Sequence, residues 1–199
     1  MAQYQFRAAD GASADAPLLF LFHGTGGDEN QFFDLAAELA PTAARIAPRG
    51  DVSEGGALRY FRRTGEGVYD MADLAQRTAA MTEFVRAEAQ KRGAREVWGL
   101  GYSNGANILA SVQFAAPELF SRTVLMHPLI PFTPPAADFG GRKVLITAGQ
   151  RDPIAPAQAT QALADYFSAS GATTEVVWHA GGHDLRQEEL LAAQRLLRA

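Results

Sequence analysis

Short apolar runs alternate along the chain with longer segments of helical periodicity. The runs that predict strands are Tyr4–Arg7, Leu18–His23, Arg45–Ala47, Glu96–Leu100, Thr123–Met126, Lys143–Thr147 and Glu175–Trp178. The strongest run, Leu18–Phe22, is apolar throughout, which is typical of a parallel strand covered by helices on both faces. Strands that alternate with helices favour right-handed crossovers within one sheet. The expected fold class is therefore α/β, with a mostly parallel, doubly wound sheet flanked by helices.

Three helices can be predicted from the residues at their ends. Asp70 is a candidate N-cap of the first helix, and Gly93 is expected to close it. Pro156 suits the first turn of a second helix that runs toward Gly171. A third helix is expected to follow Asp184. The positions expected to face the core are Leu74, Met81, Phe84 and Val85 in the first helix, Leu163, Tyr166 and Phe167 in the second, and Leu190, Leu191, Leu196 and Leu197 in the third.

The length and composition favour one globular domain over residues 1–199. No repeat or compositional break marks a boundary, and hydrophobic residues make up 47% of the chain against 20% charged ones, which excludes a disordered chain. Two connections, Arg49–Gly67 and Pro131–Gly141, lack regular patterning. Long irregular connections in a compact domain are often functional or mobile.

Charge and cysteine content narrow the function classes. The net charge of −4 gives no electrostatic reason to expect nucleic acid or an anionic membrane as a partner. The absence of cysteine excludes a disulfide framework and a thiolate nucleophile. Residues Met1–Arg7 lack the pattern of a signal peptide, and no apolar run approaches the roughly 20 residues that span a bilayer. A cytoplasmic protein without membrane insertion is expected.

The segment Val97–Leu109 predicts a strand, a sharp turn and a helix. At the turn, Gly101-Tyr102-Ser103-Asn104-Gly105 matches the G-x-S-x-G pattern of a nucleophile elbow. Glycines are needed on either side because side chains there would collide in so tight a turn. Ser103 is therefore the candidate nucleophile. The alternative, a loop serine between glycines by chance, does not account for the strand before it and the helix after it.

A serine hydroxyl needs a base to take its proton, and the chain has four histidines. His183 lies in a turn between the last strand and the last helix, as the Ser…Asp…His order of nucleophile-elbow enzymes requires. His179 ends a strand and is expected to pack or cap rather than react. His23 and His127 precede a glycine and a proline. His183 is the candidate base, with a surface-loop histidine as the alternative.

The third member of such a site holds the imidazole in the right tautomer and stabilises its cation. Asp152 follows the strand Lys143–Thr147 and precedes His183, so it is the candidate; a plain turn aspartate before a proline is the alternative. Three other aspartates compete less well. Asp138 lies in a proline-rich loop, Asp165 lies inside a helix, and Asp184 is expected to cap the last helix.

Acyl transfer also needs donors for the developing oxyanion. The backbone N–H of Asn104, next to the candidate nucleophile, is one. The backbone N–H of Thr25 is the second choice, because the glycines around it let the backbone approach a substrate closely. The loop Phe22–Asp28 has neither the lysine of a P-loop nor the G-x-G-x-x-G spacing, so nucleotide binding is not expected.

Four segments together resemble the phospholipase/carboxylesterase family of the α/β-hydrolase superfamily, which includes bacterial carboxylesterases and acyl-protein thioesterases. They are Leu21–Gly27, Gly101–Gly105, Gly149–Pro156 and Gly181–His183, in family order. The resemblance implies one α/β-hydrolase domain in which Ser103, Asp152 and His183 are catalytic and Thr25 and Asn104 form the oxyanion hole. Dienelactone hydrolases share this fold but as a family use cysteine, which this chain lacks.

Two connections in the sequence bear on the choice of substrate. Only Leu129–Gly141 fills the connection in which many α/β-hydrolases insert a lid, so a lid domain is not expected and an open crevice is. The segment Arg59–Arg63 resembles a bacterial esterase subgroup, and its arginines could grip a carboxylate or a phenolate, or pair with surface acids. The side chains assigned to substrate binding are Phe61, Arg62, Tyr102, Ile130 and Ile154, for each of which ordinary packing is the alternative.

The expected function is hydrolysis of a small, soluble carboxylic ester through an acyl-enzyme on Ser103, without a metal or an organic cofactor. An acyl-protein thioesterase or lysophospholipase-like hydrolase is one alternative. A catalytically silent binding module with the same fold is another. A homodimer is the general expectation for soluble oligomers.

Overall fold

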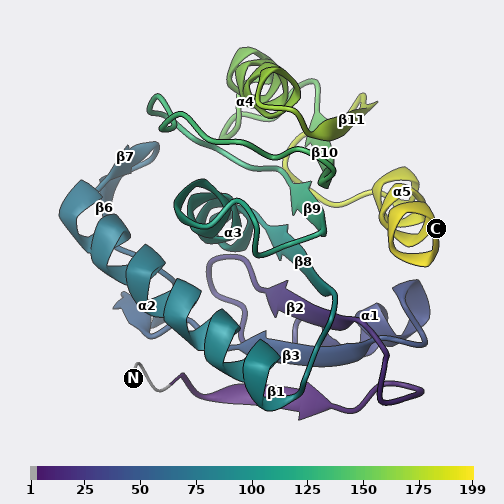
Figure 1. Cartoon of the computed structure of the whole chain (residues 1–199). Coiled ribbons are helices and arrows are strands. Elements are labelled where there is room, and N and C mark those ends of the chain that lie inside the picture. Colours follow the sequence, from purple (N-terminus) through teal and green to yellow (C-terminus); the bar gives the residue numbers. More distant parts are fainter. Residues whose placement is uncertain (1–3) are drawn as a thin grey trace.

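A seven-stranded sheet runs through the centre of the computed structural model, which describes residues 4–199 (Figure 1). Its strands, in spatial order, are β1 (Phe6–Ala9), β3 (Ala44–Pro48), β2 (Leu18–Phe22), β8 (Val97–Tyr102), β9 (Arg122–Met126), β10 (Lys143–Gly149) and β11 (Thr173–His179). Only β1 is antiparallel to its neighbour. The expected α/β class and all seven expected strands are confirmed, with ends that differ by one or two residues.

Helices cover both faces of this sheet. The helices α1 (Phe33–Leu39) and α5 (Gln187–Arg198) lie on one face, and α2 (Met71–Lys91), α3 (Asn104–Ala115) and α4 (Ala157–Ala169) lie on the other (Figure 1). The position of β2 between two layers of helices explains why its sequence is apolar throughout. Leu18, Phe20 and Phe22 pack into the core beneath α2, α3 and α4, whereas Leu19 and Leu21 pack into the core beneath α1 and α5.

The expected N-terminal residues of α2 and α4 are confirmed, but the expected N-cap of α5 is wrong. Asp70 Oδ1 accepts a hydrogen bond from the Asp73 backbone N–H at 3.0 Å, which caps α2. Pro156 immediately precedes α4. Asp184, however, does not cap α5. That helix begins later, at Gln187, because the Glu189 carboxylate turns back to accept the Arg186 backbone N–H.

The expected buried face of α5 needs a second correction. Its buried residues are Glu189, Ala192, Ala193 and Leu197. Leu197 is buried and Leu190 and Leu196 pack against the core, as expected, but Leu191 is 48% exposed.

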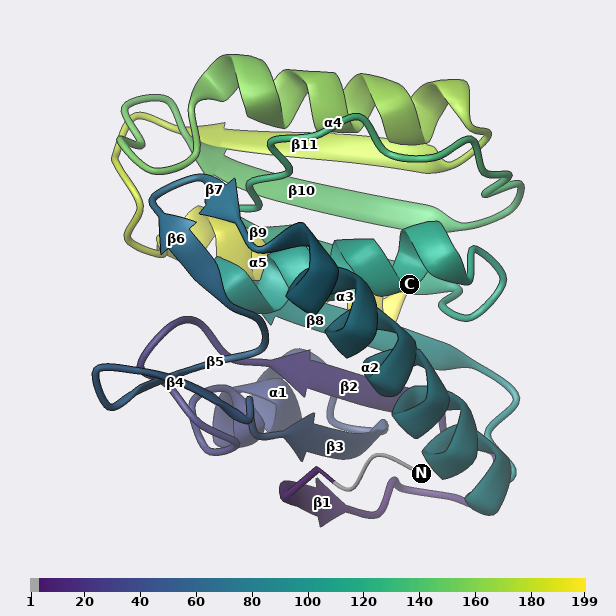
Figure 2. The same cartoon turned by 90° about the vertical axis from the view of Figure 1, so that its left-hand side faces the viewer.

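The connection after β3 contains regular structure that its glycine-rich sequence does not reveal. It forms two antiparallel hairpins of two- and three-residue strands, β4 (Val52–Glu54) with β5 (Ala57–Arg59) and β6 (Arg63–Gly65) with β7 (Val68–Tyr69). Strands this short carry too few residues for a periodic pattern. Both hairpins lie at the edge of the sheet where β2 and β3 end (Figure 2).

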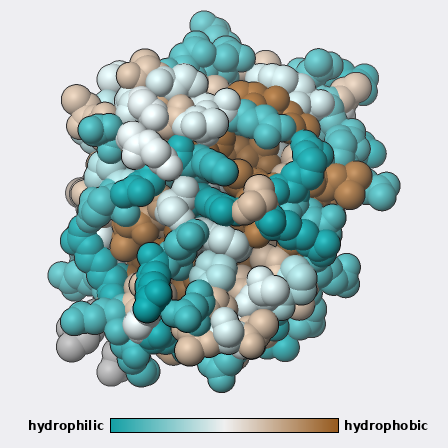
Figure 3. Space-filling model, turned by 45° about the vertical axis from the view of Figure 1, so that its right-hand side comes forward, coloured by the Kyte–Doolittle hydropathy of each residue, from teal (hydrophilic) through white to brown (hydrophobic). Residues whose placement is uncertain are grey.

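The outer surface is largely polar. In Figure 3, hydrophilic side chains cover most of the face shown, and apolar side chains gather in separate patches. No helix between residues 4 and 199 is long and apolar enough to cross a bilayer. Residues 1–3, which begin the segment in which no signal peptide is expected, lie outside the described residues.

Candidate active site

The turn from β8 to α3 holds Ser103 in a strained conformation. Its φ is 53°, in the left-handed region that few residues other than glycine adopt. A Cβ at Gly101 would lie 2.6 Å from the Gly105 carbonyl oxygen, and one at Gly105 would lie 2.3 Å from the Phe22 carbonyl oxygen. Both glycines are thus required by backbone approach, as the sequence predicts for an elbow.

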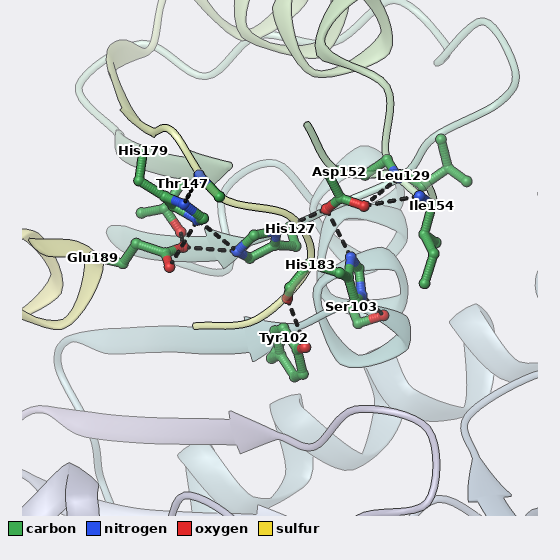
Figure 4. A network of polar contacts seen from close by, with 12 residues as sticks. Tyr102, Ser103, His127, Leu129, Thr147, Asp152, Ile154, His179, His183 and Glu189 are labelled. Carbon is green, nitrogen blue, oxygen red and sulfur yellow. Dashed lines mark hydrogen bonds and ion pairs between the residues drawn. The ribbon is translucent and has the colours of Figure 1, made fainter. Parts of the chain in front are cut away.

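Two hydrogen bonds connect Ser103 to Asp152 through His183 (Figure 4). His183 Nε2 lies 2.9 Å from Ser103 Oγ, and His183 Nδ1 lies 2.7 Å from Asp152 Oδ2. The Tyr102 hydroxyl donates to the His183 carbonyl oxygen at 2.9 Å and so ties the His183 loop to the elbow. The structure therefore brings together three residues that are far apart in the sequence.

Asp152 is held by hydrogen bonds to both of its carboxylate oxygens. Oδ1 accepts the backbone N–H groups of Ile154 at 2.8 Å and Ala155 at 3.0 Å, and Oδ2 accepts from His127 and His183. Burial alone would raise the pKa of Asp152, but these four hydrogen bonds outweigh it and lower the pKa below its ordinary value. Asp152 is therefore an anion at neutral pH.

The two residues expected to supply the oxyanion donors both line the cleft at the elbow. Asn104 is the first residue of α3, so its backbone N–H has no partner within the helix. Its side-chain Oδ1 accepts the Tyr60 backbone N–H at 2.8 Å, which fixes that residue. Thr25 is exposed beside the cleft, and its Oγ1 accepts a hydrogen bond from Arg59 Nη1 at 2.7 Å.

Ser103 and His183 open onto a cleft of about 230 Å³. Its other lining residues are Thr25, Arg59, Arg63, Glu66, Tyr69, Tyr102, Asn104, Asn107, His127, Leu129 and Ile154. Of the side chains expected to bind substrate, Tyr102 and Ile154 lie here. The lining is mixed, with several charged and amide side chains and few apolar ones.

The other three expected substrate contacts lie elsewhere. Phe61 is fully buried against Tyr69, with ring centroids 4.8 Å apart, so it packs beneath the cleft rather than lining it. Arg62 points away and pairs with Asp73 at 3.2 Å. Ile130 lines a separate apolar groove beside α4, together with Phe132 and Leu163. Phe61 and Arg62 lie in the short connection between β5 and β6, where no periodic pattern indicates which side chains face the cleft.

The arginines that line the cleft are paired with acids. Arg63 contacts Glu54 and Glu66, each at 2.9 Å, and Arg59 lies 3.4 Å from Glu54. Arg59 is only 3% exposed, and burial lowers the pKa of its guanidinium, which nevertheless stays charged at neutral pH. The sequence left two roles open for these arginines, gripping a substrate anion or pairing with surface acids, and the structure shows them paired with acids.

Four residues behind Asp152 form a buried polar network that the sequence did not predict (Figure 4). His127 Nδ1 lies 2.8 Å from Asp152, and His127 Nε2 lies 2.9 Å from Glu189 Oε1. Glu189 also contacts His179 at 3.2 Å and accepts the Thr147 hydroxyl at 2.6 Å. His179 thus packs, as expected. No local motif marks the network, because its members come from four different elements.

Two overlapping groups of described residues offer ligand atoms close enough to hold a metal ion. They are His127, Asp152 and His183, and His127, His179 and Glu189, with ligand atoms within 4.8 Å of one another. Each ring nitrogen in them already has a hydrogen-bond partner. The residues therefore satisfy one another, and the expectation of a reaction without a metal stays a prediction.

Comparison with known proteins identifies the family. The family model described as "Dienelactone hydrolase family" matches residues 59–188. A protein named "Putative hydrolase MhqD" from Bacillus subtilis (strain 168) is 38% identical over 175 residues, which cover 86% of this chain and 88% of that protein.

Two solved structures share the fold over almost the whole chain. A protein of unknown function from Agrobacterium tumefaciens str. C58 is 55% identical with a TM-score of 0.94, over 98% of this chain and 96% of that one. The carboxylesterase from Bacillus cereus is 33% identical with a TM-score of 0.94, over 99% and 94% of the two chains.

These matches agree with the geometry of the elbow and its neighbours. The sequence contains no cysteine, so the elbow of this chain holds Ser103 as its candidate nucleophile. The chain is a hydrolase with the α/β-hydrolase fold, and it belongs to the Dienelactone hydrolase family.

Proposed function

We propose that this protein is a carboxylesterase that hydrolyses small carboxylic esters through an acyl-enzyme on Ser103. One observation carries the proposal. A strained serine at a strand-to-helix elbow, open to a cleft, is hydrogen-bonded to His183 at 2.9 Å, and His183 is hydrogen-bonded to the buried Asp152 at 2.7 Å. That is the arrangement of a nucleophile, a base and a residue that orients the base.

The proposed reaction has two steps. Ser103 Oγ attacks the ester carbonyl carbon while His183 Nε2 takes the hydroxyl proton, and Asp152 stabilises the imidazolium that forms. The backbone N–H groups of Thr25 and Asn104 bind the oxyanion. His183 then gives the proton to the leaving alkoxide, and the acyl group stays on Ser103. In the second step water attacks the acyl carbon and gives a proton to His183. The bond from that carbon to Ser103 Oγ then breaks, His183 returns the proton to Oγ, and the acid leaves.

The cleft favours a small and polar substrate. Its volume of about 230 Å³ is below that of pockets for drug-sized ligands, which start at about 300 Å³. Arg59, Arg63 and Glu66 line its wall, where a long acyl chain would have to desolvate charges. This argues against the thioesterase and lysophospholipase alternatives, both of which need room for a long apolar chain.

The test is hydrolysis of 4-nitrophenyl acetate by the purified protein, compared with Ser103→Ala and Ser111→Ala. Ser111 lies two turns further along α3, where its hydroxyl donates to the Asn107 carbonyl oxygen, so it serves as a matched control. We expect Ser103→Ala to lose roughly 10⁴- to 10⁶-fold in kcat and the control to stay active. Equal rates in Ser103→Ala and wild type, with both folded, would refute the proposal and favour the silent binding module.

Two further measurements sharpen the assignment. A phosphonofluoridate should phosphonylate Ser103 Oγ with loss of fluoride, so that the wild type gains the mass of the phosphonyl group and Ser103→Ala does not. Acyl esters of increasing length, and the matching thioesters, should show kcat/KM falling beyond short chains. A maximum at long chains or with thioesters would favour the alternatives instead. The cytoplasmic location and the homodimer stay predictions of the sequence.

A further inference from the structure

Behind Asp152, on the side away from Ser103, His127 lies between two carboxylates (Figure 4). We infer that His127 is a positioning residue for the reaction, which as a buried cation anchored on Glu189 holds Asp152 against His183. The inference rests on the proposed function, since it assigns a role within the Ser103 site. It adds two residues to that site, His127, which directly follows β9, and Glu189 from α5.

The hydrogen-bond partners determine how many protons the network carries. Both ring nitrogens of His127 face a carboxylate oxygen, Nδ1 toward Asp152 at 2.8 Å and Nε2 toward Glu189 at 2.9 Å. A carboxylate can only accept, so both nitrogens carry a proton and the ring is an imidazolium. Without the second proton, one ring nitrogen would place its lone pair against a buried anion.

His179 cannot supply that charge. Its Nδ1 accepts the Gly181 backbone N–H at 3.0 Å, so Nδ1 has no proton and Nε2 donates to Glu189 at 3.2 Å. Its two ring nitrogens are thus occupied by one accepting and one donating contact. Glu189 receives four donors in all, from His127, His179, the Thr147 hydroxyl and the Arg186 backbone N–H. Its capacity as an anionic acceptor is thereby filled.

The charged and titratable groups around His127 favour its cationic form. Asp152 follows β10, Glu189 lies on α5, His179 ends β11, His183 follows β11, and Tyr102 ends β8 with its ring centroid 5.9 Å away. Burial by itself would lower the pKa of His127, but the hydrogen bonds to Glu189 and Asp152 together raise it above its ordinary value. Two anions and one cation share a site without solvent exposure.

The backbone at His127 is also strained. Its φ is 51°, and apart from Ser103 it is the only non-glycine residue between 4 and 199 in the left-handed region. Asparagine or glycine would adopt this conformation at lower cost. Strained residues persist where the surrounding structure over-determines them, and they cluster at functional sites. At this position the two carboxylates hold the ring. The backbone N–H of His127 donates to the Thr147 carbonyl oxygen at 2.8 Å and holds the backbone.

The arrangement has a mechanical and an electrostatic consequence. Mechanically, His127 and His183 both donate to Oδ2 of Asp152, so the carboxylate cannot rotate without breaking a bond to one of them. Electrostatically, the His127 cation reduces the negative field that Asp152 exerts on His183. Removing the cation should therefore strengthen the negative potential around the catalytic base. The acid limb of kcat/KM, which reports the essential base of the free enzyme, should then move to higher pH.

A pair of variants separates these two effects. His127→Asn keeps an amide N–H near the place of Nδ1 and can still donate to Asp152. His127→Gln keeps one near the place of Nε2 and can donate only to Glu189. Neither carries a charge. We expect the acid limb to move to higher pH in both, and kcat to fall about 10- to 100-fold in His127→Gln with KM little changed, while His127→Asn keeps most of its activity.

Asparagine also suits the backbone better, so stability must be controlled. Leu197→Ala lowers the stability of α5 in the core, where Leu197 is 2% exposed, without touching the network. It should lower Tm and leave the pH profile of kcat/KM unchanged. A wild-type pH profile in both folded His127 variants, or losses that only follow Tm as in Leu197→Ala, would overturn the inference.

A measurement on the wild-type protein tests the protonation of His127 without depending on whether any variant folds. The chain has only four histidines, so the ¹⁵N shifts of their ring nitrogens can be followed across neutral pH. We expect one ring, His127, to carry protons on both nitrogens throughout, and a neutral His127 would overturn the inference. Failure of the proposed function is separate, since it appears as full activity in Ser103→Ala whatever His127 does.

Discussion

A side chain at Gly105 would begin 2.3 Å from the Phe22 carbonyl oxygen, because the first turn of α3 lies directly against the end of β2. Gly105→Ala must therefore move backbone rather than a flexible side chain. We expect it to lower the free energy of unfolding by about 3 kcal/mol, at the upper end for overpacking. Urea unfolding would measure the change.

Gly65→Ala is the matched control for that substitution. Its Cβ would meet nothing closer than 3.8 Å, so the same chemical change should be tolerated there. If the two alanine variants unfold at the same urea concentration, the close approach of α3 to β2 does not limit position 105.

Ser103 should be a site where activity and stability oppose each other. Its φ of 53° costs a non-glycine residue about 1–3 kcal/mol, whereas glycine adopts it freely. We therefore expect Ser103→Gly to be at least as stable as Ser103→Ala, although glycine normally costs about 0.5–1 kcal/mol relative to alanine. Both variants lack the hydroxyl, so the comparison isolates the backbone. A clearly lower Tm for the glycine variant would argue against strain.

The buried network predicts how the stability lost in His127→Gln depends on pH. Burial favours a higher pKa for Asp152 and Glu189, but hydrogen bonds lower both in the folded state, so their contribution fades as pH falls below about 4. The pKa of His127 is raised, so its contribution is complete below about 6.5 and fades at higher pH. The difference in free energy of unfolding between wild type and His127→Gln should thus be largest near pH 5–6, and about 3–5 kcal/mol.

Urea unfolding of both proteins over a pH series would measure that difference. Taking the difference also removes the effect of His23, whose pKa burial lowers and which opposes folding at acidic pH in both proteins. A difference that does not change between pH 5 and 9 would mean that His127 does not gain a proton on folding.

The charge of the cleft should control its preference among small esters. Arg59 and Arg63 are balanced by Glu54 and Glu66, and Glu66 lines the cleft with half of its side chain exposed. Glu66→Gln leaves a net positive charge there. The ratio of kcat/KM for the mono-4-nitrophenyl ester of succinic acid to that for 4-nitrophenyl acetate should rise about two- to fivefold at low salt.

Glu83→Gln is the control for this prediction, because Glu83 is exposed on α2 and makes the same change of net charge away from the cleft. A local effect requires the ratio to stay at the wild-type value in that variant and the Glu66→Gln effect to shrink as salt is added. An equal rise in both variants would indicate a response to net charge only.

The sequence by itself determined the strands of the sheet, the α/β class and the order of the candidate residues along the chain. A strand such as β2 must be apolar throughout when helices cover both of its faces, and this pattern is local in the chain. The elbow is local as well, since Gly101, Ser103 and Gly105 lie within five residues of one another. Residues 103, 152 and 183 could be chosen because each follows a predicted strand, and the carboxyl ends of parallel strands meet at one edge.

Only the tertiary structure decided which side chains surround those three. Glu189 shows in the sequence as one acid of an amphipathic helix, and it becomes a buried partner of His127 only when α5 packs across the ends of β9 and β10. Phe61 and Arg62 are neighbours of cleft residues in the sequence, but Phe61 packs on Tyr69 beneath the cleft and Arg62 pairs with Asp73 on α2. Contacts between elements distant in the chain leave no local pattern, because each partner is selected by the packed sheet and not by its sequence neighbours.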